Sequence, residues 1–232
     1  MTEQTIKATD ETVHKILTQE IGRLGYDADL NHIDVSEVTD MSNLFNYSKF
    51  NGNISKWNVS NVKDMTQMFA HSDFNGHISW WDVSKVKDMS HMFEFCPFDG
   101  DLSKWNVSNV REIRGMFYGA DFDGDISKWN VSKVKTMAGM FASSLFNCDI
   151  SEWDVSKVED MSNMFINSNF NGDISNWDVS NVKIMSWMFS RSKFKGDIFK
   201  WDVSKVEETE SMFSECPCEE RYGKDGELIF KK

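Results

Sequence analysis

The chain has 232 residues and a formal net charge of −12. This charge argues against unspecific binding to nucleic acid and to anionic membrane surfaces, because both present negative charge. With 40% hydrophobic and 13% aromatic residues, the sequence can bury a substantial core and lacks the composition of a disordered protein. No apolar run approaches the length of a membrane span, so we expect no membrane insertion.

The first 17 residues, MTEQTIKATDETVHKIL, do not have the pattern of a signal peptide. They lack a positively charged segment followed by an apolar stretch. The sequence alone therefore predicts a cytoplasmic protein if no leader precedes these residues.

An amphipathic helix is expected over residues 10–24, with Asp10 as its cap and Gly25 as its end. Its apolar face consists of Val13, Ile16, Leu17 and Leu24. Tyr26 and Leu30 then stand 24 residues before Phe50 and Ile54, so the segment that follows the helix matches half of the repeat described next. We predict that residues 1–32 form an N-terminal helical cap with half a repeat.

A repeat of 24 residues fills positions 33–224. Tryptophan recurs at this spacing without insertion or deletion, and Ile33 takes its position in the first of eight units. The seven tryptophans are Trp57, Trp81, Trp105, Trp129, Trp153, Trp177 and Trp201. We number the places of a unit from this residue. Places 3 and 6 are always Val, place 13 is always Phe, and place 18 is Phe except for Cys218 in the last unit.

Each unit combines a helical pattern with a strand-like one. Val62, Met65 and Phe69 have the i, i+3, i+7 spacing of a helix face, and the Ser at place 4 suits a helix cap. The segment DISKWNV, residues 125–131, has the composition of a short strand. Stacked copies can bury faces that one strand and one helix cannot bury alone. The sequence therefore predicts an α/β repeat solenoid, a leucine-rich-repeat-like right-handed coil with a parallel sheet on one side, short helices on the other, and place 13 stacked inside.

The end of the chain departs from the repeat. A Lys-Asp-Gly turn at residues 224–226 precedes a short apolar run, which we interpret as hairpin-like. Because the last coil of a solenoid would otherwise expose its core, we predict that residues 225–232 form a C-terminal cap.

The unit resembles a known repeat. The stretch WDVSKVKDMSHMF, residues 81–93, is similar to the mycoplasma-type lipoprotein repeat of the BspA-like leucine-rich repeat surface proteins. The A-F-x-x-C pattern of BspA-type repeats also matches places 12–16, as in MFEFC (92–96) and MFSEC (212–216). The resemblance covers residues 33–217, with Trp, Met and Phe where ordinary leucine-rich repeats have Leu. It implies a cell-surface or secreted protein that engages host or neighbouring-cell proteins.

The sequence shows no set of unlike residues converging on one reaction centre, so we expect no enzyme and no cofactor. The five His fall at unrelated places of the repeat, and there is no HExxH motif or Gly-rich phosphate loop. The four cysteines fit no zinc pattern, and we interpret them as structural thiols.

An acidic row is the main alternative to a purely structural surface. Place 21 carries Asp101, Asp125, Asp149, Asp173 and Asp197. Stacked carboxylates could hold calcium between coils, or each could accept a hydrogen bond from its own turn. Asn53 and His77 at the same place weaken the calcium interpretation, and we predict no metal site. An ice-binding surface is disfavoured because a regular Thr array is missing.

Large aromatic residues that interrupt the repeat are the candidate binding residues, because exposed aromatics often dominate binding energy. They are Trp80, Phe95, Tyr118, Trp187 and Phe199. Trp80 and Phe199 stand at places 24 and 23, so we predict that they anchor a protein partner along the sheet face. We expect a monomeric, non-enzymatic protein-binding module, with surface adhesion or host interaction favoured. The alternative is an intracellular acidic scaffold or binding partner.

Overall fold

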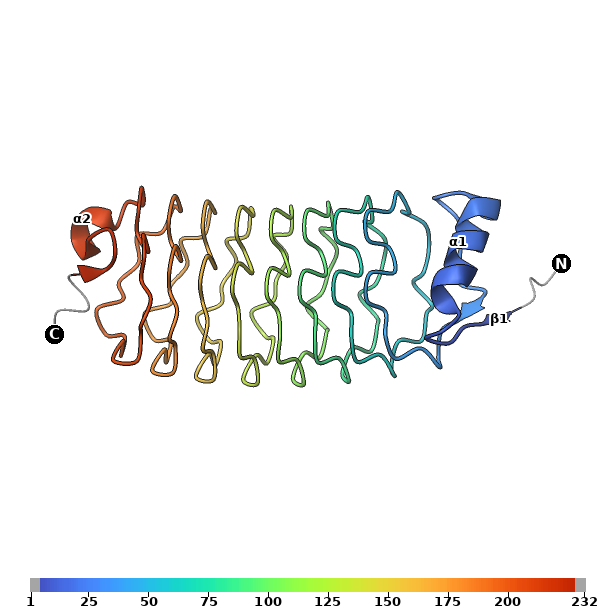
Figure 1. Ribbon diagram of the computed structural model, residues 1–232, viewed down its shortest axis with the longest axis horizontal. Coiled ribbons are helices and arrows are strands. Elements are labelled where there is room, and N and C mark those ends of the chain that lie inside the picture. Colours follow the sequence, from blue (N-terminus) through green and yellow to red (C-terminus); the bar gives the residue numbers. More distant parts are fainter. Residues whose placement is uncertain (1–4, 228–232) are drawn as a thin grey trace.

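The computed structural model describes residues 5–227. Its 24-residue units lie side by side as successive coils along one axis, with a helix at each end (Figure 1). One coil corresponds to one unit, because backbone hydrogen bonds and ring contacts recur between residues 24 or so apart. The chain is a repeat protein, as the sequence predicted.

The N-terminal helix α1, Val13–Leu24, lies within the expected range and ends at Gly25, whose φ of 95° suits glycine. It buries Val13 and Leu17 in the core of the body. Asp10 is not its cap, contrary to our prediction. The Asp10 carboxylate instead accepts hydrogen bonds from the backbone amides of Thr39 and Asp40, at 2.6 and 3.1 Å, and from the Thr39 hydroxyl. These bonds tie the start of the chain to the first coil.

Two short segments complete this end. Strand β1, Ile6–Lys7, pairs in parallel with β2, Ile33–Asp34. After α1, the carbonyls of Tyr26 and Ala28 each accept a backbone hydrogen bond of 2.9 Å from the second half of the first unit. Residues 26–30 thus stack on residues 50–54 as a half coil.

A ladder of backbone hydrogen bonds joins the coils. Isolated parallel bridges link place 8 of each unit to place 8 of the next, from Asp40 to Glu208. After place 8 of each unit, every second amide donates a hydrogen bond to the following coil. The amide of Gln67 donates to the carbonyl of Ser90 at 2.9 Å, and the amide of Phe69 donates to the carbonyl of Met92 at 2.9 Å. The same pattern at places 9, 11, 13 and 15 recurs along the body.

Our prediction of a short helix in each unit is wrong. In the described residues the only helices are α1 and α2, Glu219–Tyr222. Places 11 and 15 adopt positive φ in every unit, for example 54° at both Gln67 and His71, and a right-handed helix cannot continue through such residues. The amides that a helix would use internally are bonded to the neighbouring coil.

The predicted strand around place 1 is also wrong. Places 23 and 24 form a turn, closed by a bond of 3.1 Å from the amide of Trp57 to the carbonyl of Ile54. The parallel contacts lie at place 8 instead, on the stretch that we expected to be helical. The only sheet in the described residues is the pair β1–β2.

Each turn is prepared by an Asp or Asn side chain. Asn58 Oδ1 accepts the amide of Ser60 at 3.2 Å, Asp64 Oδ1 that of Thr66 at 2.8 Å, and Asp101 Oδ1 that of Ser103 at 2.8 Å. These are places 2, 8 and 21, and the same bond recurs in other units at each of these places. Asp and Asn favour such local bonds, which is why the recurring Asp-x-Ser pattern marks turns and not helix caps.

The interior consists of stacked aromatic rows. Phe141 at place 13 is fully buried, with its ring centroid 5.9 Å from Phe117 and 5.8 Å from Phe165. Within its own coil it lies 4.0 Å from Phe146 at place 18. Each repeat tryptophan donates its indole N–H to a carbonyl 27 residues earlier, as Trp129 does to Leu102 at 3.0 Å. The predicted inner stack of place 13 is confirmed.

The C-terminal end satisfies the amides that have no following coil. Ser211 donates to the carboxylate of Asp225, Phe213 to the carbonyl of Lys224, and the amide of Glu215 to the carboxylate of Glu219. Tyr222 of α2 is buried and packs on Phe213 at a ring distance of 5.1 Å. The predicted cap at 225–232 lies outside the described residues beyond Glu227.

Candidate binding surface

The outward-facing residues at places 11 and 15 form the most varied surface of the repeat. Their positive φ values follow from the coil-to-coil hydrogen bonds, because the same conformation occurs whether the residue is Tyr47, Gly119 or Arg191. Identical backbone geometry on consecutive coils brings side chains at the same place next to one another. The side chains at place 15 therefore form a row along the axis, and the residue type in this row changes from one coil to the next.

Four rings form a continuous row over the first four coils, which we call the aromatic ridge: Tyr47, His71, Phe95 and Tyr118. Tyr47 stacks on His71 with ring centroids 4.5 Å apart and planes 7° apart. His71 stacks on Phe95 at 5.2 Å, and Tyr118 meets the edge of Phe95 at 4.9 Å. Tyr47 is 73% exposed and Phe95 47% exposed, so the ridge presents ring surface to solvent.

Two glycines of the fourth coil leave room for rings of the third coil, Phe95 of the ridge and His91 beside it. A Cβ on Gly119 would lie 2.4 Å from Phe95 Cε1, and one on Gly115 would lie 2.5 Å from His91 Nδ1. Next to these rings is a shallow depression of about 290 Å³. Its lining includes Tyr118, Gly139, Ala142, Asn163 and Ile166. Together, the raised ridge and the depression give this face an uneven shape that the regular coils lack.

A carboxylate supports the ridge from beneath. Glu94 Oε2 lies 2.9 Å from His91 Nδ1, an ion-pair distance without hydrogen-bond alignment, and its other oxygen lies 3.9 Å from His71 Nε2. The Glu94 side chain is 15% exposed. One carboxylate therefore lies within ion-pair distance of two imidazoles on adjacent coils.

The structure places the five predicted binding residues in four different parts of the coil body. Phe95 and Tyr118 come together in the ridge. Trp187 is 36% exposed at place 11 of the seventh unit, further along the same varied stretch of the coil. Trp80 is 76% exposed, and the ammonium of Lys104 lies 3.8 Å from its ring centroid.

Phe199 takes part in the C-terminal end of the body. Its ring packs edge-on against Tyr222 at 5.0 Å, and the guanidinium of Arg221 lies 4.8 Å from its centroid. The sheet face on which we expected Trp80 and Phe199 does not exist, because places 23 and 24 form a turn. Sequence reasoning missed His71 as a member of the ridge, although aligning place 15 puts it between Tyr47 and Phe95.

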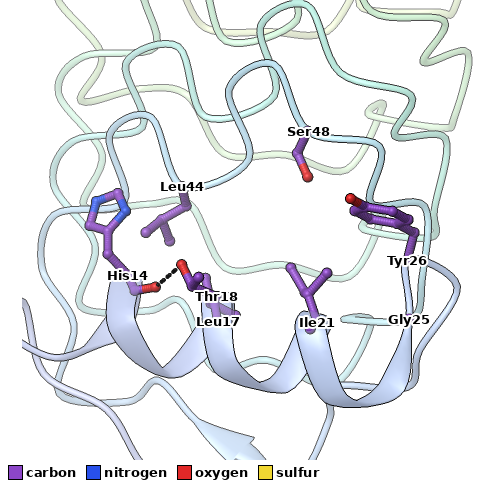
Figure 2. Close-up of a pocket in the computed structure, with 9 residues that line it drawn as sticks. His14, Leu17, Thr18, Ile21, Gly25, Tyr26, Leu44 and Ser48 are labelled. Atoms are coloured by element: carbon purple, nitrogen blue, oxygen red, sulfur yellow. Dashed lines mark hydrogen bonds between the residues drawn. The ribbon is translucent and has the colours of Figure 1, made fainter.

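A second concavity separates α1 from the first coil (Figure 2). This cleft of about 460 Å³ has His14 and Tyr26 at its two ends and Leu17, Leu44 and Ser48 along its walls. Leu44 stands at place 12, where every later unit has the longer Met, which leaves room beneath the helix. The Thr18 hydroxyl donates to the carbonyl of His14 and is used within the helix.

The acidic row at place 21 is engaged in its own turns. Hydrogen bonds from the hydroxyl and the amide of Ser103 hold the pKa of Asp101 below its ordinary value, and Ser127 does the same for Asp125. In residues 5–227 no group of three or more His, Cys, Asp or Glu side chains is arranged to hold a metal ion. The row thus has a structural use, in which each of these carboxylates accepts hydrogen bonds from the serine two residues later.

Three of the four thiols, those of Cys96, Cys216 and Cys218, are buried, and that of Cys148 is half-buried. Cys96 and Cys216 stand at place 16, where the other units have Ser or Ala. Burial raises the pKa of Cys96 to about 11, which makes it a weak nucleophile. All four cysteines are free, and a small inward side chain explains place 16 without further chemistry.

No helix in the described part of the chain is both long and apolar enough to cross a bilayer. No curated protein and no solved structure matches the chain. The family described as "Mycoplasma protein of unknown function, DUF285" matches three overlapping stretches, residues 17–122, 93–169 and 120–221. These stretches cover the helix α1 in part and nearly all of the repeats, and the chain therefore belongs to the DUF285 family of mycoplasma proteins.

Proposed function

We propose that this chain is a non-enzymatic protein-binding module whose aromatic ridge contacts a partner, with adhesion to host or neighbouring cells as its role. The observation that carries this proposal is the exposed stack of Tyr47, His71 and Phe95, closed by Tyr118. Exposed, ordered aromatic rings bury much apolar area at little entropic cost when a partner binds. The depression beside Tyr118 offers a partner side chain a place to insert.

The architecture that we propose is a right-handed solenoid of the leucine-rich-repeat type, as in BspA-like proteins, with Phe, Trp and Met in place of Leu. The stacking of one coil per unit and the small residue at place 16 support it. The proposed location at a cell surface or outside the cell rests on the resemblance to BspA-like proteins. Elongated repeat bodies typically use a long surface to bind macromolecules, which is consistent with this role.

The test compares two exposed aromatic residues on different parts of the coil. A partner captured from cell-surface extracts by the parent protein is titrated against Phe95→Ala and against the matched control Trp80→Ala. We expect Phe95→Ala to weaken binding by about 2 kcal/mol, which is roughly 30-fold. Trp80→Ala should bind within about twofold of the parent, since Trp80 lies outside the ridge.

Both variants are checked for folding by circular dichroism. Equal binding by Phe95→Ala and the parent would refute the ridge as the contact surface. Weakening by Trp80→Ala or Phe199→Ala alone would move the surface to the turn at places 23 and 24.

A further inference from the structure

A basic groove runs across the coils of this acidic protein. Two adjoining depressions of about 380 and 320 Å³ run across units two to eight between the rows of places 5 and 7. Their cationic residues are Lys63, Lys85, Lys87, Arg111, Lys133, Lys135, Lys157, Lys183 and Lys205. The groove thus holds nine of the 25 Lys and Arg residues but only one, Glu159, of the 37 Asp and Glu residues.

The backbone holds these cations at the spacing of the coils. The amide of Lys87 donates to the carbonyl of Lys63 at 2.8 Å, and that of Arg111 to Lys87 at 2.8 Å. Neighbouring cations of place 7 therefore start about 4.8 Å apart. Like charges at this spacing repel one another, and folding does not require them, because these side chains are exposed. Since a surface that served only solubility would mix both signs, the segregation calls for another explanation.

Several of the ammonium groups are positioned by amides. Asn109 donates its Nδ2 to the carbonyl of Ser84 at 2.8 Å, and its Oδ1 accepts the Lys133 ammonium at 2.7 Å. The same arrangement recurs for Asn61 with Lys85 and for Asn181 with Lys205. An ammonium carries three donors, and the amide takes one of them. The remaining donors can serve an anion in a groove whose walls are mainly lysine methylene groups.

We propose that this groove binds an unbranched acidic polysaccharide, with its sulfate or carboxylate groups on the lysine rows. This site goes beyond the proposed function, because none of its residues belongs to the aromatic ridge. A pyranose ring spans a distance close to the coil spacing of about 4.8 Å, so successive sugars stay in register with successive coils. The methylene walls suit the apolar faces of sugar rings.

Other polyanions fit the groove less well. Single-stranded nucleic acids rely on aromatic stacking, and the groove lining contains no aromatic residue. Side chains on one face of an extended acidic peptide repeat about every 6.7 Å and fall out of register with the coils. A wide DNA duplex would also meet the exposed carboxylates of place 2, such as Asp82, Asp154 and Asp178.

The experiment measures binding of a size-defined heparin oligosaccharide to the full chain by calorimetry at several salt concentrations. The groove variant is Lys87→Glu/Arg111→Glu/Lys135→Glu. Glutamate suits this place, since Glu159 and Glu207 occupy it in other units. We expect at least a tenfold loss of affinity and a shallower salt dependence, because fewer counterions are displaced.

The matched control, Lys56→Glu/Lys128→Glu/Lys200→Glu, changes net charge equally through exposed residues at place 24. It should bind within about threefold of the parent, because these residues do not line the groove and charges outside it are screened at moderate salt. Equal losses in both variants would show an effect of net charge and overturn the site. The neutral variant Lys87→Gln/Arg111→Gln/Lys135→Gln keeps the test valid if the charge reversal unfolds the chain.

Comparison ligands decide the chemical class. Neutral dextran should not bind. A linear polyphosphate, a polyglutamate or a DNA duplex of equal charge should bind at least tenfold more weakly than the sulfated oligosaccharide. Equal or tighter binding of any of these would overturn the polysaccharide assignment, and so would no binding of the oligosaccharide by the parent. Partner binding through the ridge should be unchanged in the groove variant, which separates this proposal from the previous one.

Discussion

Places 13 and 15 of the repeat lie only two residues apart, but they differ completely in the variety of residue types that occupy them. Place 13 is Phe in all eight units and is buried in every one. Place 15 holds eight different residues in eight units, all with positive φ. A left-handed conformation costs a residue other than glycine about 1–2 kcal/mol. Because so many residue types adopt it here, the stacked coils impose this conformation and the side chain at place 15 does not determine it.

The coil thus separates the residues that hold it together from those that are free to vary. The inner rows repeat because each ring must meet the same ring on the next coil. The outer rows are free to vary because the hydrogen bonds that hold their backbone involve no side chain. Outward side chains can therefore vary to form surfaces such as the aromatic ridge and the basic groove, while the backbone of the coils stays the same.

Deletions give the largest expected effect. Removing the whole unit 129–152 joins Lys128 to Trp153 and keeps every ladder in register, so the shortened protein should fold with reduced stability. Removing only 129–140 would bring unlike places opposite each other, and we expect no cooperative unfolding transition. Thermal unfolding followed by circular dichroism measures both. Similar transitions in the two deletions would contradict the idea that registered inner rows hold the coils together.

Truncating the inner row comes next. Phe141→Ala should lower the free energy of unfolding by about 3–5 kcal/mol, because it removes a buried ring from contacts with Phe117, Phe146 and Phe165. The control Asn167→Ser changes place 15 to the residue found one unit earlier and should cost under about 1 kcal/mol. Chemical denaturation measures both variants. Comparable losses would remove the distinction between the two places.

The indole hydrogen bond is expected to matter less than the ring stack. Trp129→Phe keeps an aromatic ring but removes one of the two donors to the Leu102 carbonyl, which keeps its 3.0 Å hydrogen bond from the amide of Trp105. The loss of one such hydrogen bond costs about 0.5–1.5 kcal/mol, and denaturation curves should show a loss of this size. A loss below about 0.5 kcal/mol would mean that water replaces the indole at this site.

The turn carboxylates should give a smaller effect that depends on pH. Hydrogen bonds from the amide and hydroxyl of Ser175 lower the pKa of Asp173, so its contribution to stability is present above the unfolded-state pKa of about 3.9. That contribution is lost as the pH falls through the lower pKa of the folded state. Asp173→Asn keeps the acceptor, as Asn53 does at the same place, and should change the midpoint at pH 7 only slightly. Melting curves from pH 7 to pH 3 should fall less steeply for this variant than for the parent.

Metal removal should have the smallest effect of all. The carboxylates of place 21 accept backbone amides, so melting curves with and without a chelator should coincide. A drop of many degrees with the chelator would restore the calcium interpretation of the row from Asp101 to Asp197.

The sequence predicted the repeat and its inner rows because both follow from spacing alone. It misassigned the stretch around Val62, Met65 and Phe69 for a physical reason. Turns that close every few residues with left-handed corners at Gln67 and His71 give the same apolar spacing as a helix. The decisive difference is that the amides bond to the next coil, and no single unit reveals this.

The candidate surfaces were predicted less completely than the fold. Phe95 and Tyr118 were recognised because they interrupt the pattern, whereas His71 was overlooked because a histidine can pass for a scattered polar residue. The basic groove was hidden by the net charge of −12, which sums over all faces of the molecule. Reading place 7 alone, as Lys63, Lys87, Arg111 and Lys135 on consecutive coils, would have revealed the segregation.

The direction of the coil-to-coil hydrogen bonds also gives the body an electrical axis. Four amides of each coil, at places 9, 11, 13 and 15, point toward the C-terminal end and their peptide dipoles add as they do in a helix, whereas the amide of place 7 points the other way. Along the stretch of places 9 to 15 the last coil is the positive pole, and two of the groups that close it, on Asp225 and Glu219, are carboxylates. The two ends are thus chemically unlike, and a further unit can join only head to tail. A whole unit inserted between two coils would meet the same hydrogen-bonding edges on both sides and would leave the two ends unchanged.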